Sequence, residues 1–160
     1  MKNIILYIGL LIMVLLVPVD GIDVADLQPV QTVVLYGKDG KITLATDTGD
    51  VGTGEDSLEA LQELKASTPG IIYLDTADYL LVTEETLGEV TALRDHLKAS
   101  VEIYCFRGQI DPKAVSKYLS VHGNGPKLKE WNEAAPLPVL TTENDRIIFL
   151  QKKAKIALDN

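Results

Sequence analysis

The chain has 160 residues, of which 46% are hydrophobic and 24% charged, and this balance predicts one folded domain with a substantial core. The formal net charge is −8. That charge argues against a nucleic-acid partner, because phosphates require a basic surface, and against adhesion to anionic lipid head groups.

The first residues differ in character from the rest of the chain. Lys2 precedes an apolar run from Ile4 to Val19, and aspartates follow from Asp20 onward. A positive start, an apolar stretch and an acidic far flank predict export, with the remainder of the chain extracytoplasmic. Residues 1–21 are interpreted either as a signal peptide cleaved after Gly21 or as a helix retained as a membrane anchor.

The rest of the chain divides into three parts. Residues 22–29 are expected to form a linker, residues 30–150 a single domain and residues 151–160 a flexible tail. The domain opens with two segments typical of strands, 31–36 and 41–46, the second alternating as a half-buried strand does.

Between these two strands lies Asp39-Gly40, a pair that tolerates the positive φ of a hairpin turn. From Asp56 the periodicity becomes helical. Residues 71–74 and 79–82 are nearly all apolar and predict two buried strands or one interrupted strand. An amphipathic helix is expected over residues 84–97.

The last third of the domain continues this alternation. Residues 101–106 predict an interior strand, and Asp111 before Pro112 predicts a capped helix start. Segments 136–140 and 146–150 predict a closing hairpin. The fold class expected is α/β (α+β): a single mixed β-sheet with packed helices, preceded by the N-terminal hydrophobic helix.

The stretch TDTGDVGTG at residues 46–54 raises the question of catalysis. Asp47 and Gly49 belong to the tripeptide DTG that aspartic proteases place at a catalytic carboxylate, and a near-copy contains Asp75 and Asp78. Such chemistry needs two carboxylates sharing one proton. Asp75 lacks the following glycine, and the helical middle of the chain does not suit an all-strand protease scaffold.

A second interpretation of this stretch is a phosphate-binding loop formed by Gly49, Gly52 and Gly54 before a helix. The surrounding carboxylates would repel phosphate, and the lysine of nucleotide-binding loops is missing. The interpretation favoured here is a turn between a strand and a helix, with Thr53 or Asp56 as the helix cap.

Other reactive side chains are few. His96 and His122 each end a predicted helix, where capping is expected. Cys105 lies within an apolar strand, where burial is expected. No metal site and no cofactor are predicted. Residues 76–79 form either a solvent-facing bend or an exposed recognition edge, and both alternatives stay open.

The order of segments resembles a known family. The stretch GTGEDSLEALQELKASTPGIIYLDTADYLLVTEETL, residues 52–87, is similar to the N-terminal domain of the Ger(x)C-type C subunit of bacterial spore germinant receptors. The similarity spans roughly residues 30–122, through the strand VEIYCFRG and the helix after it. The resemblance implies a membrane-facing protein that contacts other receptor subunits.

We therefore expect a non-catalytic, extracytoplasmic, membrane-associated interaction module with a link to spore germination. Its expected partners are membrane protein subunits. Candidate interaction residues are Asp47, Gly49, Asp75 and Asp78. The alternative is a small secreted hydrolase in which Asp47 and Asp75 are catalytic.

Overall fold

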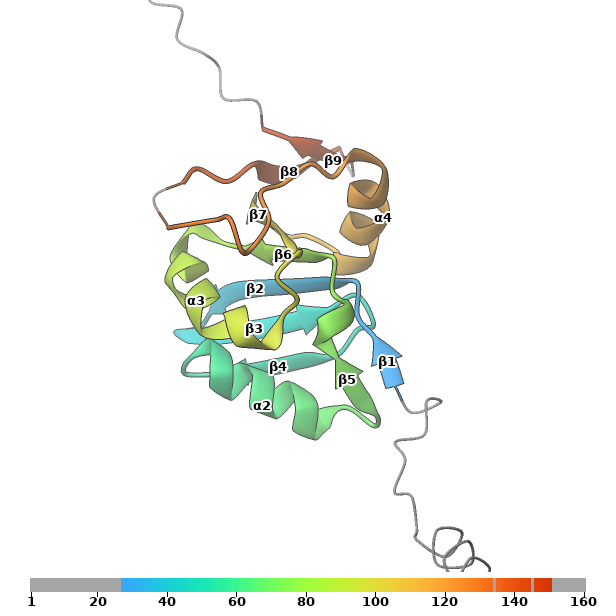
Figure 1. Ribbon diagram of the computed structural model, residues 1–160, viewed down its shortest axis with the longest axis vertical. Helices are drawn as coiled ribbons and strands as arrows, with labels where there is room; N and C mark the ends of the chain where they lie inside the picture. Colours follow the sequence, from blue (N-terminus) through green and yellow to red (C-terminus); the bar gives the residue numbers. More distant parts are fainter. Residues whose placement is uncertain (1–26, 134, 145, 151–160) are drawn as a thin grey trace, which may run out of the picture.

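The computed structural model describes residues 27–133, 135–144 and 146–150, and the predicted signal or anchor helix lies outside that range. The described chain forms a mixed seven-stranded sheet in the order β4-β3-β2-β6-β7-β8-β9, with helices on both faces (Figure 1). The predicted mixed α and β fold is confirmed in outline, with strands predominating. The elements, in chain order, are β1 (Leu27–Pro29), β2 (Thr32–Lys38), β3 (Lys41–Thr46), β4 (Val51–Gly54), α2 (Ser57–Ser67), β5 (Ile71–Tyr73), η2 (Leu74–Thr76), β6 (Tyr79–Val82), η3 (Glu84–Glu89), α3 (Val90–Leu93), η4 (Arg94–His96), β7 (Glu102–Arg107), α4 (Pro112–His122), β8 (Val139–Glu143) and β9 (Arg146–Phe149).

Four neighbouring strands, β2, β6, β7 and β8, run parallel in the centre of the sheet. The antiparallel strands lie at the edges, with β3 and β4 on one side and β9 on the other. A hairpin forms at each end of the domain, as predicted, but the first strand of the closing hairpin is β8 at Val139–Glu143 and not residues 136–140. The β2–β3 turn uses Asp39 and Gly40 at φ of 54° and 76°, and the β8–β9 turn places Asn144 at φ of 50°.

The prediction of a single sheet is wrong, because strands β1 and β5 form a separate, parallel two-stranded sheet. The expected linker therefore ends in a strand over Leu27–Pro29. The prediction of a fully buried strand at residues 71–74 is wrong, because Ile71 and Tyr73 are 43% and 45% exposed while Ile72 and Leu74 are buried. Only one side of this small sheet packs on the core, and apolar content alone does not reveal which side.

The expectation that residues 46–54 form only a turn is also corrected. The turn ends at Asp50, and the glycines Gly52 and Gly54 lie in strand β4. Helix α2 crosses directly over these glycines: a Cβ at Gly52 would overlap the backbone of Ala60 and Leu64. The two glycines therefore allow a helix to approach a strand at backbone contact distance.

The helix predicted over residues 84–97 is broken into η3, α3 and η4. Its start is held by Thr83 and Thr86, which cap each other, and the Thr86 hydroxyl also donates to the Leu35 carbonyl oxygen. This bond ties the first turn to strand β2. Gly88, a poor helix former, follows within the same segment.

The two faces of the sheet are covered unequally. The first face packs against α2, the η3–α3–η4 segment and the loop carrying Leu128 and Trp131. Within the described residues, the second face packs against one helix, α4, through Val115 and Leu119. A helix of 11 residues is about 16 Å long and ~10 Å wide, whereas seven strands span about 29 Å. Among the described elements, this one helix is too small to cover the whole second face.

Candidate functional site

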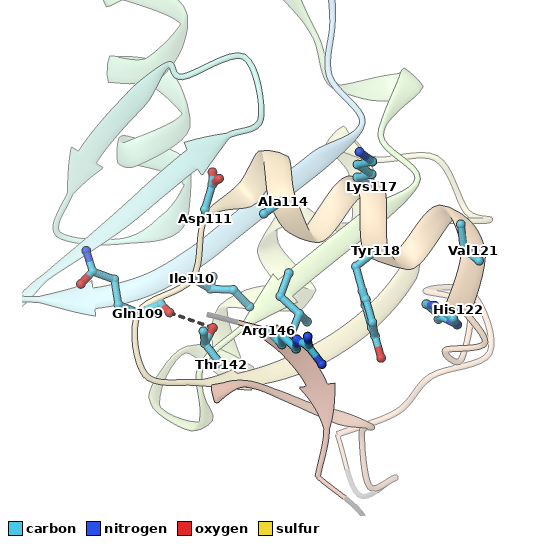
Figure 2. A pocket seen from close by; sticks show the side chains of 11 residues that line it. Gln109, Ile110, Asp111, Ala114, Lys117, Tyr118, Val121, His122, Thr142 and Arg146 are labelled. Carbon is cyan, nitrogen blue, oxygen red and sulfur yellow. Dashed lines mark hydrogen bonds between the residues drawn. The ribbon is translucent and has the colours of Figure 1, made fainter. Parts of the chain in front are cut away.

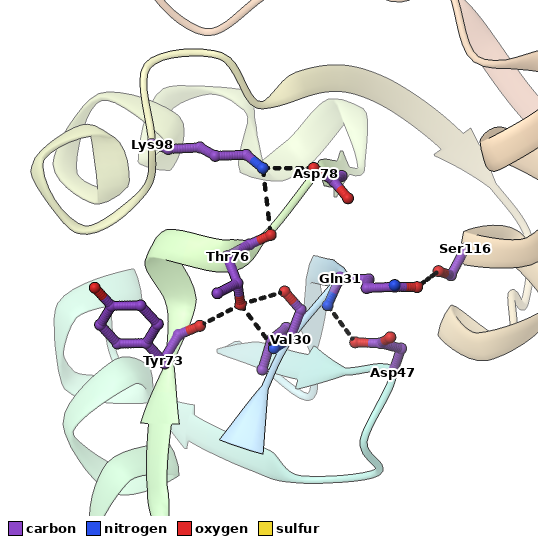
Figure 3. Close-up of polar contacts among 8 residues, drawn as sticks. All are labelled: Val30, Gln31, Asp47, Tyr73, Thr76, Asp78, Lys98 and Ser116. Carbon is purple, nitrogen blue, oxygen red and sulfur yellow. Dashed lines mark hydrogen bonds and ion pairs between the residues drawn. The ribbon is translucent and has the colours of Figure 1, made fainter. Parts of the chain in front are cut away.

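Asp47 holds the start of strand β2 in place. Its Oδ1 accepts hydrogen bonds from the backbone N–H groups of Gln31 and Thr32, at 3.0 and 3.1 Å. Gly49 adopts a φ of +97° in the adjoining turn, a conformation that favours glycine. Figure 3 shows the Asp47 carboxylate directed at Gln31, whose side chain reaches Ser116 on α4. Asp47 therefore stabilises the start of β2, and Gly49 allows the turn between β3 and β4.

Asp78 and its neighbours connect β6 to the same region. The Asp78 carboxylate pairs with Lys98, and its backbone N–H donates to the Gln31 carbonyl oxygen at 2.8 Å. The Thr76 hydroxyl accepts from the Val30 N–H at 3.0 Å (Figure 3). In the structure Thr76 ends η2, Ala77 is buried and Tyr79 opens β6, so this segment is tied to the chain entering β2. A role as a recognition edge stays a prediction.

Asp75 lies elsewhere. It lines a small cavity of about 190 Å³ together with Lys65, Asp95 and His96, and Asp47 is not among the residues lining that cavity. No hydrogen bond joins the carboxyl groups of Asp47 and Asp75 in the described chain. The structure therefore does not bring the two aspartates together as the proton-sharing pair that an aspartic protease needs.

The structure also argues against a phosphate-binding loop at Gly52 and Gly54, because the space beside these glycines is occupied. The free sides of Gly52 and Gly54 face the backbone of α2, so no anion fits there. The amides at the start of α2 already have acceptors: the Asp56 side chain caps the Glu59 N–H at 2.8 Å, and Glu89 accepts from Ser57. Of the two predicted caps, Thr53 and Asp56, the structure uses Asp56 as the N-cap of α2.

The structure also shows where the cysteine and the two histidines lie. The Cys105 thiol is buried, and burial raises its pKa, which lowers its reactivity at neutral pH. The His122 ring packs against Tyr118 at a tilt of 41°, with ring centroids 4.7 Å apart, and His96 lines the small Asp75 cavity. Across residues 27–133, 135–144 and 146–150, no three histidine, cysteine or carboxylate side chains gather as a metal site.

A large hollow lies on the second face, beside α4. It is a groove of about 990 Å³ between α4 and the β8–β9 hairpin, and Figure 2 shows its lining side chains. One stripe of α4 forms its wall. We call it the α4–β9 groove; its lining residues are Gln109, Ile110, Asp111, Ala114, Lys117, Tyr118, Val121, His122, Thr142, Arg146 and Ile147.

Sequence reasoning did not find this groove. The periodicity of α4 marks its buried side, where Val115 and Leu119 are, but does not say that the neighbouring stripe faces a hairpin. One signal was present: Val121, which is 75% exposed, is a large apolar residue on the polar side of the helix. An exposed apolar side chain beside a hollow is more informative than one standing alone.

The groove combines apolar and basic groups. Tyr118, Val121 and Ile147 supply apolar surface, and Lys117 and Arg146 supply positive charge. Within the described part of the chain, neither cation takes part in an ion pair. The positive lining contrasts with the net charge of −8 of the whole chain.

Asp111 is the one carboxylate among the residues that line the groove. Its Oδ1 accepts the Lys113 N–H at 3.1 Å as the N-cap of α4, so this carboxylate is held at the helix end. A smaller hollow of about 330 Å³ adjoins the groove through Gln109 and Ile110 and is floored by Val34 and Phe106. The two hollows together follow the uncovered part of the second face.

Comparison of the chain with protein-family models, with curated proteins and with solved structures finds no match. The resemblance to germinant-receptor C subunits therefore stays a prediction. Within the described residues, no helix is both long and apolar enough to cross a membrane.

Proposed function

We propose that this protein is a non-catalytic, extracytoplasmic binding module that contacts a partner protein through the α4–β9 groove. The observation that carries the proposal is the groove itself, about 990 Å³ of basic and apolar surface on the face that α4 alone covers. Its residues 1–21 hold it at the membrane or release it after cleavage. The resemblance to germinant-receptor C subunits suggests membrane protein subunits of a spore-forming bacterium as partners.

The chemistry of the groove suits binding. Exposed apolar groups beside unpaired cations offer a partner both buried area and charge complementarity. The two aspartates that suggested a hydrolase are Asp47 and Asp75: Asp47 accepts from two backbone amides, and Asp75 lines a small cavity whose lining does not include Asp47. These contacts favour the binding module over the secreted hydrolase.

A photoreactive amino acid at Val121 tests the proposed function. Val121 is 75% exposed and lines the groove, so we expect it to crosslink one defined partner in membranes from sporulating cells of the source organism. Leu58 on α2 is the matched control, because it is also apolar and 38% exposed but lies on the other side of the sheet. No adduct at Val121, or equal adducts at both positions, would contradict the proposal.

A double variant, Asp47→Asn with Asp75→Asn, tests the hydrolase alternative. Asparagine keeps an acceptor oxygen for the Gln31 and Thr32 amides, so the unfolding free energy is expected to stay within about 0.5 kcal/mol of the parent. Crosslinking at Val121 is expected to persist. The measurements are urea unfolding and peptidase and glycosidase assays on both proteins. Activity in the parent that disappears in the double variant would overturn the non-catalytic assignment.

A further inference from the structure

Strand β9 ends the main sheet, and its outer side carries no neighbouring strand within residues 27–133, 135–144 and 146–150. The direction of its backbone groups follows from one hydrogen bond. The Leu150 N–H donates to the Val139 carbonyl oxygen at 2.8 Å, so this pair is hydrogen-bonded. Because such pairs alternate along an antiparallel ladder, Ile148 faces β8, whereas the N–H and C=O groups of Ile147 and Phe149 face away from it.

The same two residues border the α4–β9 groove. The side chains of Ile147 and Phe149 pack on the second face, and Phe149 lies 5.8 Å from Tyr118 of α4, centroid to centroid. Groove residues extend along α4 from Asp111 to His122. Tyr118 of α4 and the side chains of Ile147 and Phe149 thus meet at the strand side of the groove. An extended segment paired with the free edge of β9 would lie along the open side of this groove.

Charge selects among extended segments. Lys117 and Arg146 line the groove without an ion pair in the described chain, and His122 adds a third basic group at the far end. The Asp111 carboxylate is held by its own helix. A segment with acidic side chains facing α4 would place carboxylates near unpaired cations, whereas a basic segment would meet like charges.

We propose that the occupant of the groove is an extended acidic segment of a partner protein, which adds a strand to the free edge of β9. The proposal rests on the proposed function and specifies how the partner is bound. The outward amide and carbonyl groups of Ile147 and Phe149 supply main-chain hydrogen bonds. Val121 and Tyr118 receive apolar side chains of the segment, and Lys117 and Arg146 receive its carboxylates.

Two labelled peptides of roughly eight residues, long enough to cover the strand, test the proposal on the full chain. One alternates valine with glutamate, and the other alternates valine with lysine. Fluorescence anisotropy is expected to show binding of the glutamate peptide at least about tenfold tighter than of the lysine peptide. Equal affinities, or no binding of the glutamate peptide at about millimolar protein, would overturn the proposal.

Charge reversal locates the site. Lys117→Glu and Arg146→Glu are each expected to weaken binding of the glutamate peptide by about fivefold. The control is Lys113→Glu, because Lys113 is exposed on the same helix but does not line the groove. Circular dichroism confirms folding of each variant. A loss with Lys113→Glu as large as that with the groove variants would show non-specific attraction and overturn the proposal.

A matched pair of variants tests the main-chain bonds. Ile147→Ala shortens the side chain and keeps the outward N–H, whereas Ile147→Pro also removes that N–H, which proline can do at a solvent-facing edge position. Binding is expected to be about fivefold weaker for Ile147→Pro than for Ile147→Ala. Hydrogen exchange of the Ile147 and Phe149 amides is expected to slow with peptide bound. Unchanged exchange at both amides would contradict strand addition.

The result also separates this inference from the proposed function. A crosslinked partner at Val121 together with no strand addition at β9 would leave the binding module standing and reject the acidic strand. Peptide binding at β9 without a crosslinked partner at Val121 would support strand addition to β9 and reject the proposed binding of a partner protein in cells.

Discussion

Gly52→Ala is expected to lower the free energy of unfolding by about 3 kcal/mol, at the upper end for overpacking of a core. A Cβ at this position would overlap the Ala60 carbonyl oxygen and the Leu64 N–H, and it would lie 2.8 Å from the Leu64 Cα. These are backbone atoms, which do not rotate away as a side chain would. Helix α2 must therefore move off strand β4, which opens the core around Leu61. Urea unfolding followed by circular dichroism measures the loss.

Gly88→Ala is the control for this variant. Gly88 has open space around its Cβ position, and its φ is not positive, so alanine there is expected to be neutral or stabilising by up to about 1 kcal/mol. Gly54 faces the same helix, and its substitution is expected to resemble that of Gly52. Equal stability of Gly52→Ala and the parent would mean that α2 does not contact β4 as described.

Tyr104→Phe is expected to destabilise the protein by about 3 kcal/mol, because its one hydroxyl makes three hydrogen bonds, one of them to a carboxylate. The Tyr104 hydroxyl donates to Glu102 Oε2 at 2.6 Å and accepts from the N–H groups of Asn124 and Gly125 at 2.8 and 2.7 Å. Burial raises the pKa of Tyr104, and the bond to Glu102 raises it further, so the hydroxyl stays protonated at neutral pH.

The position of this network explains the size of the effect. Helix α4 ends at His122 with Gly123 as its C-cap, and the chain then turns towards the first face, where Leu128 joins the core. Phenylalanine would leave the Asn124 amide without its acceptor at that turn. The matched control is Tyr73→Phe, because Tyr73 is 45% exposed and its change is expected to stay within about 0.5 kcal/mol. Similar unfolding midpoints for both variants would refute the role of the network.

Local signals predicted several elements correctly. Asp39-Gly40 adopts positive φ between β2 and β3, Asp111 caps α4, and the closing hairpin forms as expected. Each of these depends on residues that are neighbours in the chain. One continuous helix was predicted over residues 84–97 from apolar periodicity alone. The structure has three short helical segments there, and the first is bonded to strand β2 through Thr86.

Four candidate residues, Asp47, Gly49, Asp75 and Asp78, were singled out by a short motif. In the structure Asp47 and Gly49 lie in a turn, Asp78 pairs with Lys98, and Asp75 lines a small cavity whose lining does not include Asp47. A three-residue motif does not specify where its copy will lie. The α4–β9 groove had no motif, because it is made by a helix and a hairpin that meet only after folding.

The sequence by itself determined the turns, the helix caps and the alternation of strands and helices, since backbone dihedral preferences and apolar periodicity act over a few residues. The tertiary structure alone decided that Gly52 and Gly54 seat α2, that β1 and β5 pair apart from the main sheet, and that α4 covers one face alone. These features depend on the register and packing of distant segments. The groove and the free edge of β9 follow from that packing.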